Sequence, residues 1–226
     1  MIAQQLEKFW QDLKPYNSKL IPVSKTKSNE QVMEAYEAGN KIFGENKVQE
    51  LVGKHEALPK DIEWHYIGHL QRNKVKYIAP FVHLIHAVDS LRLLNAINKE
   101  AKKSDRIIEC LLQIYIAKED TKFGFTGEEL EELLKTTDWP TLTNIKIVGL
   151  MGMATNTNDF DQIRDEFKHL SGLKEKINLM ELPDNIELRE LSMGMTNDYK
   201  IALEEGSTMI RIGTAIFGAR VCKIDG

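Results

Sequence analysis

Ile21-Pro22-Val23-Ser24-Lys25-Thr26-Lys27 is the stretch around which the predicted fold is organised. Its apolar start predicts a buried β-strand, on which Val23 and Lys25 would point to one face because side chains alternate along a strand. Burying an ammonium is costly unless it is paired or takes part in chemistry. For this heptapeptide alone, a strand-end lysine that reaches water is the simpler interpretation. The rest of the chain therefore decides what Lys25 does.

Strand-like and helix-like segments alternate along the whole sequence. Short apolar runs predict strands, and apolar residues at helical spacing separate these runs. The runs cover residues 20–25, 41–44, 64–68, 82–88, 107–116, 145–150, 186–191 and 209–212. Repeated strand–helix units require a parallel sheet. Eight such units predict a single-domain (β/α)8 TIM barrel over residues 1–226, with an open doubly wound sheet as the alternative.

Helix boundaries carry their own signals. Ser28 to Gln31 and Thr126 to Glu129 have the form of capping boxes, and Asn46 is expected to cap the helix that follows it. Apolar spacing over residues 2–13 predicts an additional N-terminal helix. Because only about fourteen residues follow the eighth strand, we expect this helix to pack where the barrel's closing helix would otherwise lie.

Composition narrows the class of protein. The 226 residues carry a net charge of −4, so no overall basic field favours nucleic acid or acidic membranes. No apolar run approaches the roughly 18 residues of a membrane span, and the first residues lack the pattern of a secretory signal. Cys110 and Cys222 form neither a disulfide framework nor a metal set. We expect a cytoplasmic protein with no nucleic-acid or membrane partner.

The histidines do not predict a metal centre. His65 and His69 are four residues apart, but Gly68 lies between them and His65 is on a predicted strand, so the spacing of a helical zinc pair does not apply. His83 and His86 flank another strand and receive the same interpretation. Ordinary hydrogen-bonded histidines are expected, and no metal ligands.

Functional residues are expected at the carboxyl ends of the strands. In a (β/α)8 barrel the active site lies there, and phosphate commonly binds after strands seven and eight. The predicted strand ends carry Lys25, Gly44-Glu45-Asn46, Gly68, Asp89, Met151-Gly152-Met153, Ser192-Met193-Gly194-Met195 and Arg211-Ile212-Gly213-Thr214. The last two groups offer hydroxyls and exposed backbone N–H groups, which suit a phosphate. Closure of the barrel would place Lys25 beside them.

Several spaced motifs resemble the pyridoxal phosphate homeostasis protein family. The resemblance runs from the first helix to Arg220. Its motifs are Val23-Ser24-Lys25-Thr26-Lys27, Phe43-Gly44-Glu45-Asn46, Glu63-Trp64-His65-Tyr66-Ile67-Gly68, Leu70-Gln71-Arg72-Asn73-Lys74, Gly149-Leu150-Met151, Leu191-Ser192-Met193-Gly194-Met195 and Arg211-Ile212-Gly213-Thr214-Ala215-Ile216-Phe217-Gly218. The resemblance implies a barrel that holds pyridoxal 5′-phosphate (PLP, vitamin B6).

The matching motifs also imply which residues bind the cofactor. They are Lys25, Asn46, Met151, Ser192, Arg211, Gly213 and Thr214. The resemblance implies that Lys25 forms the Schiff base and that Arg211 is the partner of the pyridine nitrogen. It implies that Ser192, Gly213 and Thr214 bind the phosphate, whereas Asn46 and Met151 are pocket positions.

The resemblance implies a carrier rather than an enzyme. A guanidinium at the ring nitrogen would leave that nitrogen unprotonated and weaken the ring as an electron sink. The barrel domain of alanine racemase-like enzymes is similar, but those enzymes use a tyrosine from an additional β-domain as a second base, and no such domain is expected here. We therefore expect a PLP homeostasis protein without a catalytic site.

Other interpretations stay open at this point. PLP-dependent apoenzymes would be the transient recipients of the cofactor. Lys27 is expected in the loop after the first strand, as an exposed charge or as a second amine during transfer. A weak PLP-dependent amino-acid racemase and an interaction scaffold with a vestigial cofactor site are the alternatives.

Overall fold

The computed structural model describes residues 1–118 and 123–218, so Arg220 and Cys222 lie outside the described residues. The strands are β1 (Lys19–Pro22), β2 (Ile42–Glu45), β3 (Glu63–Tyr66), β4 (Leu84–Val88), β5 (Ile108–Gln113), β6 (Ile145–Met151), β7 (Ile186–Ser192) and β8 (Met209–Ile212). The helices are α1 (Ile2–Leu13), α2 (Asn29–Glu37), α3 (Val48–Ala57), α4 (Val75–Ile78), α5 (Leu91–Lys103), α6 (Gly127–Thr136), α7 (Phe160–Asn178), α8 (Tyr199–Glu204) and α9 (Thr214–Phe217), with 3-10 turns η1 (Arg72–Lys74) and η2 (Trp139–Thr141).

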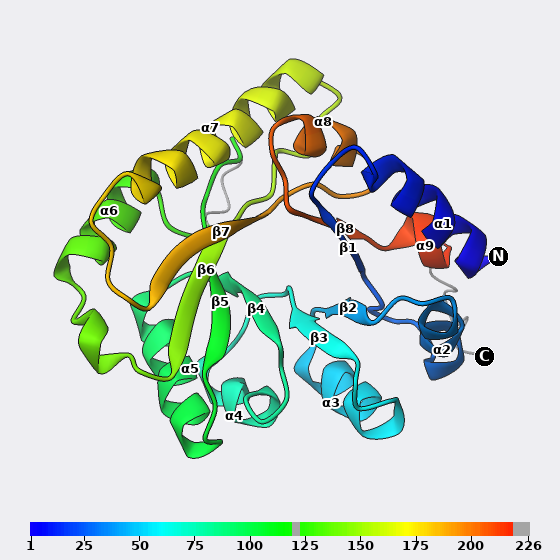
Figure 1. Cartoon of the computed structure of the whole chain (residues 1–226), viewed down its shortest axis with the longest axis horizontal. Helices are drawn as coiled ribbons and strands as arrows, with labels where there is room; N and C mark the ends of the chain where they lie inside the picture. Colours follow the sequence, from blue (N-terminus) through cyan, green and yellow to red (C-terminus); the bar gives the residue numbers. More distant parts are fainter. Residues whose placement is uncertain (119–122, 219–226) are drawn as a thin grey trace, which may run out of the picture.

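The strands form one parallel sheet that closes into a barrel. Their order is β1-β8-β7-β6-β5-β4-β3-β2. The two edge strands meet where Val23 pairs with Gly44 in a single parallel bridge, and the Ser24 N–H donates to the Gly44 carbonyl at 3.0 Å. Figure 1 shows the helices arranged around the outside of these strands. The predicted (β/α)8 barrel is confirmed, and the open sheet is excluded.

The sequences of the strands are nearly continuous apolar runs because both faces of each strand are covered. On the outer face, the fully buried rings of Phe43 and Trp64 pack with their centroids 5.8 Å apart beneath the helices. The inner face of the barrel forms a second, smaller apolar cluster. Its members are Ile21, Leu84, Ala87, Leu111, Val148, Met151 and Met209.

The N-terminal helix packs where we expected it. Helix α1 buries Leu6 and Phe9 on one stripe, and it contacts both α2 and α9. The rings of Phe9 and Tyr199 meet edge to face at 5.3 Å, and the Tyr199 hydroxyl donates to Asp12 at 2.7 Å. Figure 1 shows α1 beside α9, so α1 covers the strands that the four-residue α9 is too short to cover.

Local signals were correct at some boundaries and wrong at others. Ser28 and Thr126 both form the predicted capping boxes. Asn46 does not cap α3: the N-cap is Lys47, which makes no side-chain cap bond. Strand β1 ends at Pro22, earlier than the apolar run suggested, because Val23 pairs only through the single bridge to Gly44. Lys25 consequently lies in a turn beyond the strand.

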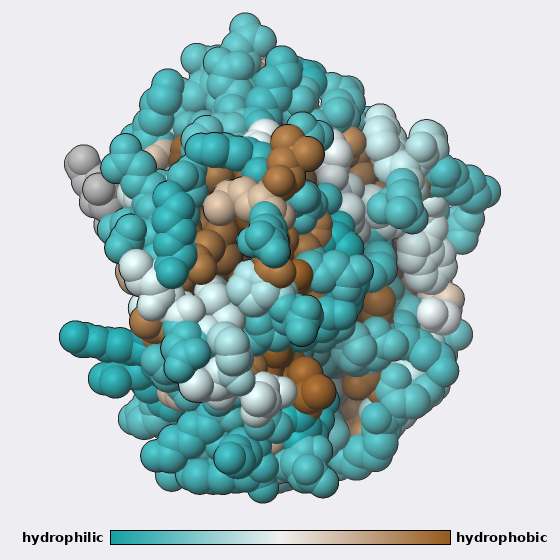
Figure 2. Space-filling view, turned by 60° about the vertical axis from the view of Figure 1, so that its left-hand side comes forward, coloured by the Kyte–Doolittle hydropathy of each residue, from teal (hydrophilic) through white to brown (hydrophobic). Residues whose placement is uncertain are grey.

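The exposed surface is largely hydrophilic, as the many charged residues of the sequence lead us to expect. On the face drawn in Figure 2, hydrophilic residues cover most of the area, and hydrophobic residues show in small groups near its centre. Among the described residues, none of the helices has the length and apolarity that a membrane crossing requires.

Candidate functional site

A cavity of about 370 Å³ opens at the carboxyl ends of the strands. Residues from the loops after β1, β2, β3, β5, β6, β7 and β8 contribute to its wall, together with side chains of β5 and β8. The lining residues are Val23, Lys25, Asn46, Ile67, Gly68, His69, Gln113, Phe123, Met153, Met195, Thr196, Arg211, Gly213 and Thr214. The barrel therefore brings together five of the seven residues that the sequence singled out.

A buried ionic cluster holds the turn that carries Lys25. The Lys54 ammonium of α3 donates to the Ser24 carbonyl at 2.6 Å and to Glu45 Oε1 at 2.5 Å. The Ser24 hydroxyl donates to the same Glu45 oxygen at 2.7 Å. Burial raises the pKa of Glu45, and the nearby Lys54 opposes that rise. The cluster fixes the backbone immediately before Lys25.

A second contact fixes the backbone immediately after Lys25. Thr26 has a φ of +63°, a conformation that costs a β-branched residue free energy. Its N–H donates to Glu50 Oε2 of α3 at 2.7 Å, which holds the turn in place. The two anchors on α3 leave the Lys25 side chain as the free element of the turn.

The two lysines of this turn have different surroundings. Lys25 is half-buried and lines the cavity, and within the described residues its amine has no hydrogen-bond or ion-pair partner. Lys27 lies in the following loop, as expected, where its amine donates to the carbonyls of Phe217 at 3.3 Å and Gly218 at 2.8 Å. Lys27 thus ties this loop to the end of α9.

Arg211 is a buried cation on the cavity wall. Its side chain extends from β8, and the residue is 5% exposed. Nη1 donates to Ser192 Oγ at 2.6 Å, and Nη2 donates to the Gly152 carbonyl at 3.0 Å. Burial lowers its pKa to about 10, an effect that Asp198 partly opposes. Among the described residues, no carboxylate lies within ion-pair distance, so the guanidinium keeps its charge with neutral partners only.

The loops after β7 and β8 form one end of the cavity. Gly213 precedes α9 and Thr214 is its first residue, so the first N–H groups of this turn have no acceptor within it. Thr196, in the loop after β7, lines the same cavity. Gly194 allows this loop to turn: its φ is +95°, and an added Cβ would lie 2.6 Å from that of Ala202. Hydroxyls and backbone donors therefore converge here.

Asn46 presents an unsatisfied acceptor at the cavity. Its Oδ1 is buried and has no hydrogen-bond partner among the described residues. Gly68 permits the close approach of this segment, because an added Cβ would lie 2.5 Å from both the Cβ and the carbonyl oxygen of Asn46. A buried polar atom without a partner costs free energy, and a ligand in the cavity would relieve that cost.

Two of the expected residues do not line the cavity. Ser192 is fully buried, and its hydroxyl is engaged by Arg211 and by His86 Nδ1 at 2.9 Å. Met151 belongs to the apolar cluster inside the barrel. Thr196 and Met153 line the cavity instead. Thr196 directly follows the quoted motif, and its hydroxyl in the loop after the seventh strand was the available signal.

A chain of polar groups runs along the barrel interior to Arg211. His65 Nδ1 lies 3.0 Å from His86 Nε2, and His86 continues to Ser192. Burial, with smaller effects of His83 and Lys19, lowers the pKa of His65 to about 3. Burial, followed by His65 and Arg211, lowers the pKa of His86 well below its ordinary value. Both histidines are therefore neutral in the folded protein.

Acidification should destabilise the fold through these two histidines. The unfolded chain binds protons near the ordinary pKa of 6.5, whereas folded His65 binds one only at about 3. The unfolding free energy should consequently fall as the pH drops below 6.5, by about 1.4 kcal/mol per pH unit for each histidine. Urea unfolding at several pH values measures this slope. His86→Gln should flatten it and the exposed His169→Gln should not; equal slopes for the three proteins would contradict the assignment.

The fold and the cavity define a barrel of the alanine racemase type: residues 1–221 match the family model "Alanine racemase, N-terminal domain". The chain is also 41% identical to the pyridoxal phosphate homeostasis protein of Aquifex aeolicus, over 90% of this chain and 87% of that protein. It belongs to the pyridoxal phosphate homeostasis protein family.

Solved structures agree with this assignment. The chain matches PipY of Synechococcus elongatus PCC7942 without PLP, with a TM-score of 0.88 and 32% identity over 96% of this chain and 100% of that one. It matches PipY with PLP bound at a TM-score of 0.83 with the same identity and coverage. Diaminopimelate decarboxylase of Helicobacter pylori, at 15% identity and a TM-score of 0.73 over 95% of this chain and 61% of that one, shares the fold.

Proposed function

We propose that this chain binds PLP in the cavity at the carboxyl ends of its strands and serves intracellular PLP homeostasis. The observation that carries the proposal is the convergence of Lys25 and Arg211 on one cavity beside the loops after β7 and β8. The PLP-bound PipY structure supports the choice of ligand. The proposal treats residues 1–226 as one cofactor-binding domain that works in the cytoplasm.

The residues of the cavity fit the cofactor. The Lys25 amine has no partner among the described residues, Arg211 is buried without a carboxylate, and Asn46 Oδ1 is buried without a hydrogen bond. PLP carries an aldehyde, a pyridine nitrogen, a ring hydroxyl and a phosphate. These groups can serve as the interaction partners that the three side chains lack. When bound, PLP supplies a carbonyl that condenses with amines and a ring that withdraws electrons.

Each residue has a role in this proposal. Lys25 supplies the amine that would condense with the cofactor's aldehyde to a Schiff base, with the aldehyde oxygen leaving as water. Arg211 donates to the pyridine nitrogen, and Ser192 holds the guanidinium in place through their 2.6 Å contact. Gly213 and Thr214 bind the phosphate through backbone N–H groups and a hydroxyl.

The remaining positions shape the pocket. Thr196 adds a hydroxyl at the phosphate end, and Asn46 binds the polar edge of the ring. Met151 lies in the apolar cluster inside the barrel, and we assign it a packing role next to the pocket.

Removing a hydroxyl at the phosphate end should weaken cofactor binding. Thr196→Val keeps the shape of the side chain and deletes one donor, and a hydrogen bond to a charged group contributes about 1.5–3 kcal/mol. The affinity for PLP should therefore fall at least about 10-fold. Equilibrium dialysis measures the change. Thr143→Val, which alters an exposed threonine preceding β6 at the opposite end of the barrel, is the matched control. Equal affinities for the two variants would remove Thr196 from the site.

We propose that the bound cofactor is carried and released rather than used in catalysis. The described residues lining the cavity include no tyrosine or cysteine that could act as a second acid–base group. One observation favours the racemase alternative: His69 lines the cavity, and its Nδ1 lies 3.1 Å from Asp89 Oδ2.

Exchange of the α-proton of amino acids in D2O separates the carrier from the racemase. We expect the cofactor-loaded protein to exchange alanine no faster than free PLP does. Exchange above that rate that is lost in His69→Gln would instead establish the racemase.

Delivery to apoenzymes is the functional test of the carrier. The cofactor-loaded protein, dialysed free of excess PLP, should restore activity to a PLP-dependent apoenzyme. Restoration no faster than spontaneous PLP release, measured in the same buffer without the apoenzyme, would limit the protein to storage of the cofactor.

A further inference from the structure

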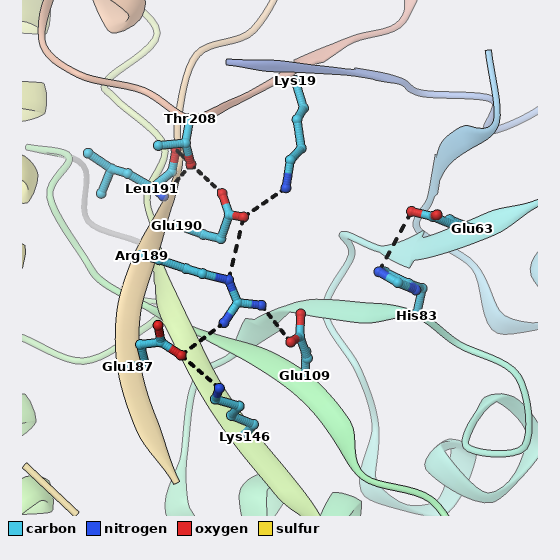
Figure 3. A network of polar contacts seen from close by, with 10 residues as sticks. All are labelled: Lys19, Glu63, His83, Glu109, Lys146, Glu187, Arg189, Glu190, Leu191 and Thr208. Carbon is cyan, nitrogen blue, oxygen red and sulfur yellow. Dashed lines mark hydrogen bonds and ion pairs between the residues drawn. The ribbon is translucent and has the colours of Figure 1, made fainter. Parts of the chain in front are cut away.

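Three potential metal ligands meet at the opposite end of the barrel. Glu63 and His65 lie on β3, and His83 directly precedes β4. One ligand atom from each of the three side chains lies within 4.8 Å of the others. Figure 3 shows Glu63 and His83 facing one another, apart from the ion-paired network around Arg189. The cluster is at the amino ends of the strands, away from the cofactor cavity.

His65 is the buried member of this cluster. The residue is 2% exposed. Its Nδ1 is engaged by His86 at 3.0 Å, whereas its Nε2 is buried and has no hydrogen-bond partner among the described residues. A buried ring nitrogen without a partner costs free energy. Its position beside Glu63 and His83 indicates that a ligand completes this group.

Glu63 and His83 are open to solvent. Their side chains are 47% and 48% exposed, and His83 Nε2 lies 3.7 Å from Glu63 Oε2. At this distance the two side chains do not form a hydrogen bond. The ring of His83 stacks on that of His65 at 5.5 Å between centroids. An ion could therefore enter from the solvent side and reach the buried nitrogen.

Glu63 also differs from the other carboxylates of this end. Glu190 pairs with Lys19 at 2.8 Å, Glu109 with Arg189 at 2.5 Å and Glu187 with Lys146 at 2.7 Å. Within the described part of the chain, the ion pair of Glu63 is with the imidazole of His83, which is uncharged unless protonated. Figure 3 shows the same separation between the neutralised network and this pair.

We propose that Glu63, His65 and His83 bind a divalent transition-metal ion, with Zn²⁺ as the best match. Two imidazoles and one carboxylate are a ligand set that zinc uses, with an open position for water. Tetrahedral ligands about 2.0–2.1 Å from zinc lie about 3.4 Å apart. The ligand atoms lie within 4.8 Å of one another, so the exposed side chains of Glu63 and His83 would have to rotate to reach that spacing. Mg²⁺ and Ca²⁺ prefer all-oxygen ligands and match this set poorly.

The hydrogen-bonded side chains inside the barrel would orient His65 for metal binding. A metal ion on His65 Nε2 places the ring proton on Nδ1, which then donates to His86 Nε2. Such hydrogen bonds orient metal-binding histidines. His86 in turn contacts Ser192, whose hydroxyl accepts from Arg211. The two ends of the barrel are thereby connected through hydrogen-bonded side chains.

Spacing along the chain did not indicate this cluster. From the sequence we expected no metal site, because we compared only residues close in the chain: His65 with His69, and His83 with His86. The site arises instead from the pairing of β3 with β4, where the His83 N–H donates to the Trp64 carbonyl at 2.8 Å. This register places His83 next to the alternate residues Glu63 and His65.

Calorimetric titration of the full, untagged, cofactor-loaded chain with ZnCl₂ tests the proposal. We expect saturable binding of one equivalent, and His83→Gln and Glu63→Gln should each weaken it at least about 10-fold. Both altered side chains are exposed, so folding should be unaffected. Co²⁺ used as a second probe should give visible d–d absorption in the wild type and lose it in His83→Gln.

His169→Gln is the matched control. It removes an exposed histidine of α7 that belongs neither to the cluster nor to the cofactor cavity, and it should bind Zn²⁺ like the wild type. Absence of saturable binding, unchanged affinity in both cluster variants, or loss of binding in His169→Gln would each overturn the proposal.

Discussion

Replacing Lys25 with alanine is expected to abolish the covalent link to PLP and leave the fold intact. Only a neutral primary amine attacks the aldehyde, and among the described residues Lys25 is the lysine that lines the cavity. Its side chain has no hydrogen-bond or ion-pair partner among the described residues, so its loss removes no native contact of that kind. The visible absorption of the linked cofactor should disappear in Lys25→Ala, while thermal unfolding should change little.

Lys27→Ala is the matched control for this prediction. Lys27 lies two residues away and its amine contacts the carbonyls of Phe217 and Gly218. The control should keep the absorption band of the wild type. A band that persists in Lys25→Ala and is lost in Lys27→Ala would transfer the covalent role to Lys27.

Replacing Lys54 with methionine is expected to cause the largest loss of stability. The side chain of Lys54 is 7% exposed and that of its partner Glu45 is fully buried. Removing one partner of a buried ion pair costs about 3–5 kcal/mol, because the other charge is left uncompensated. The Ser24 carbonyl also loses its donor. Urea unfolding at neutral pH measures the change in unfolding free energy.

A surface pair provides the comparison for Lys54. Lys41 and Asp61 form an ion pair at 2.6 Å with both side chains about half exposed. Exposed pairs contribute about 0–1 kcal/mol, so Lys41→Met should have a small effect. A loss for Lys54→Met no greater than that for Lys41→Met would show that the buried cluster does not stabilise the Lys25 turn.

Periodicity in the sequence was sufficient to predict the barrel. The apolar runs matched strands with both faces covered, and the bounds of α1 (Ile2–Leu13) and β8 (Met209–Ile212) agree with the predicted segments. Strand ends were less predictable, because an apolar run does not reveal where pairing stops. Val23 is buried yet pairs only through the single bridge that closes the barrel.

The cavity was predictable where a residue follows its strand directly. Lys25, Asn46, Gly213 and Thr214 lie just beyond their strands, and Arg211 is the penultimate residue of β8. The position of each such residue follows from the strand alone.

The positions of other residues depend on contacts between strands that are far apart in the sequence. Ser192 is occupied by Arg211 and His86, which come from other strands. The cluster of Glu63, His65 and His83 likewise depends on the register between β3 and β4. Neither arrangement can be read from spacing along the chain.

Borohydride reduction of the PLP-loaded protein, followed by mass mapping of its peptides, tests the central claim most directly. Reduction fixes the cofactor on the amine that holds it, and each candidate lysine can be distinguished by its peptide fragments. We predict a single reduced adduct on Lys25. An adduct on another lysine, or none at saturating PLP, would contradict the assignment of this cavity as the cofactor site.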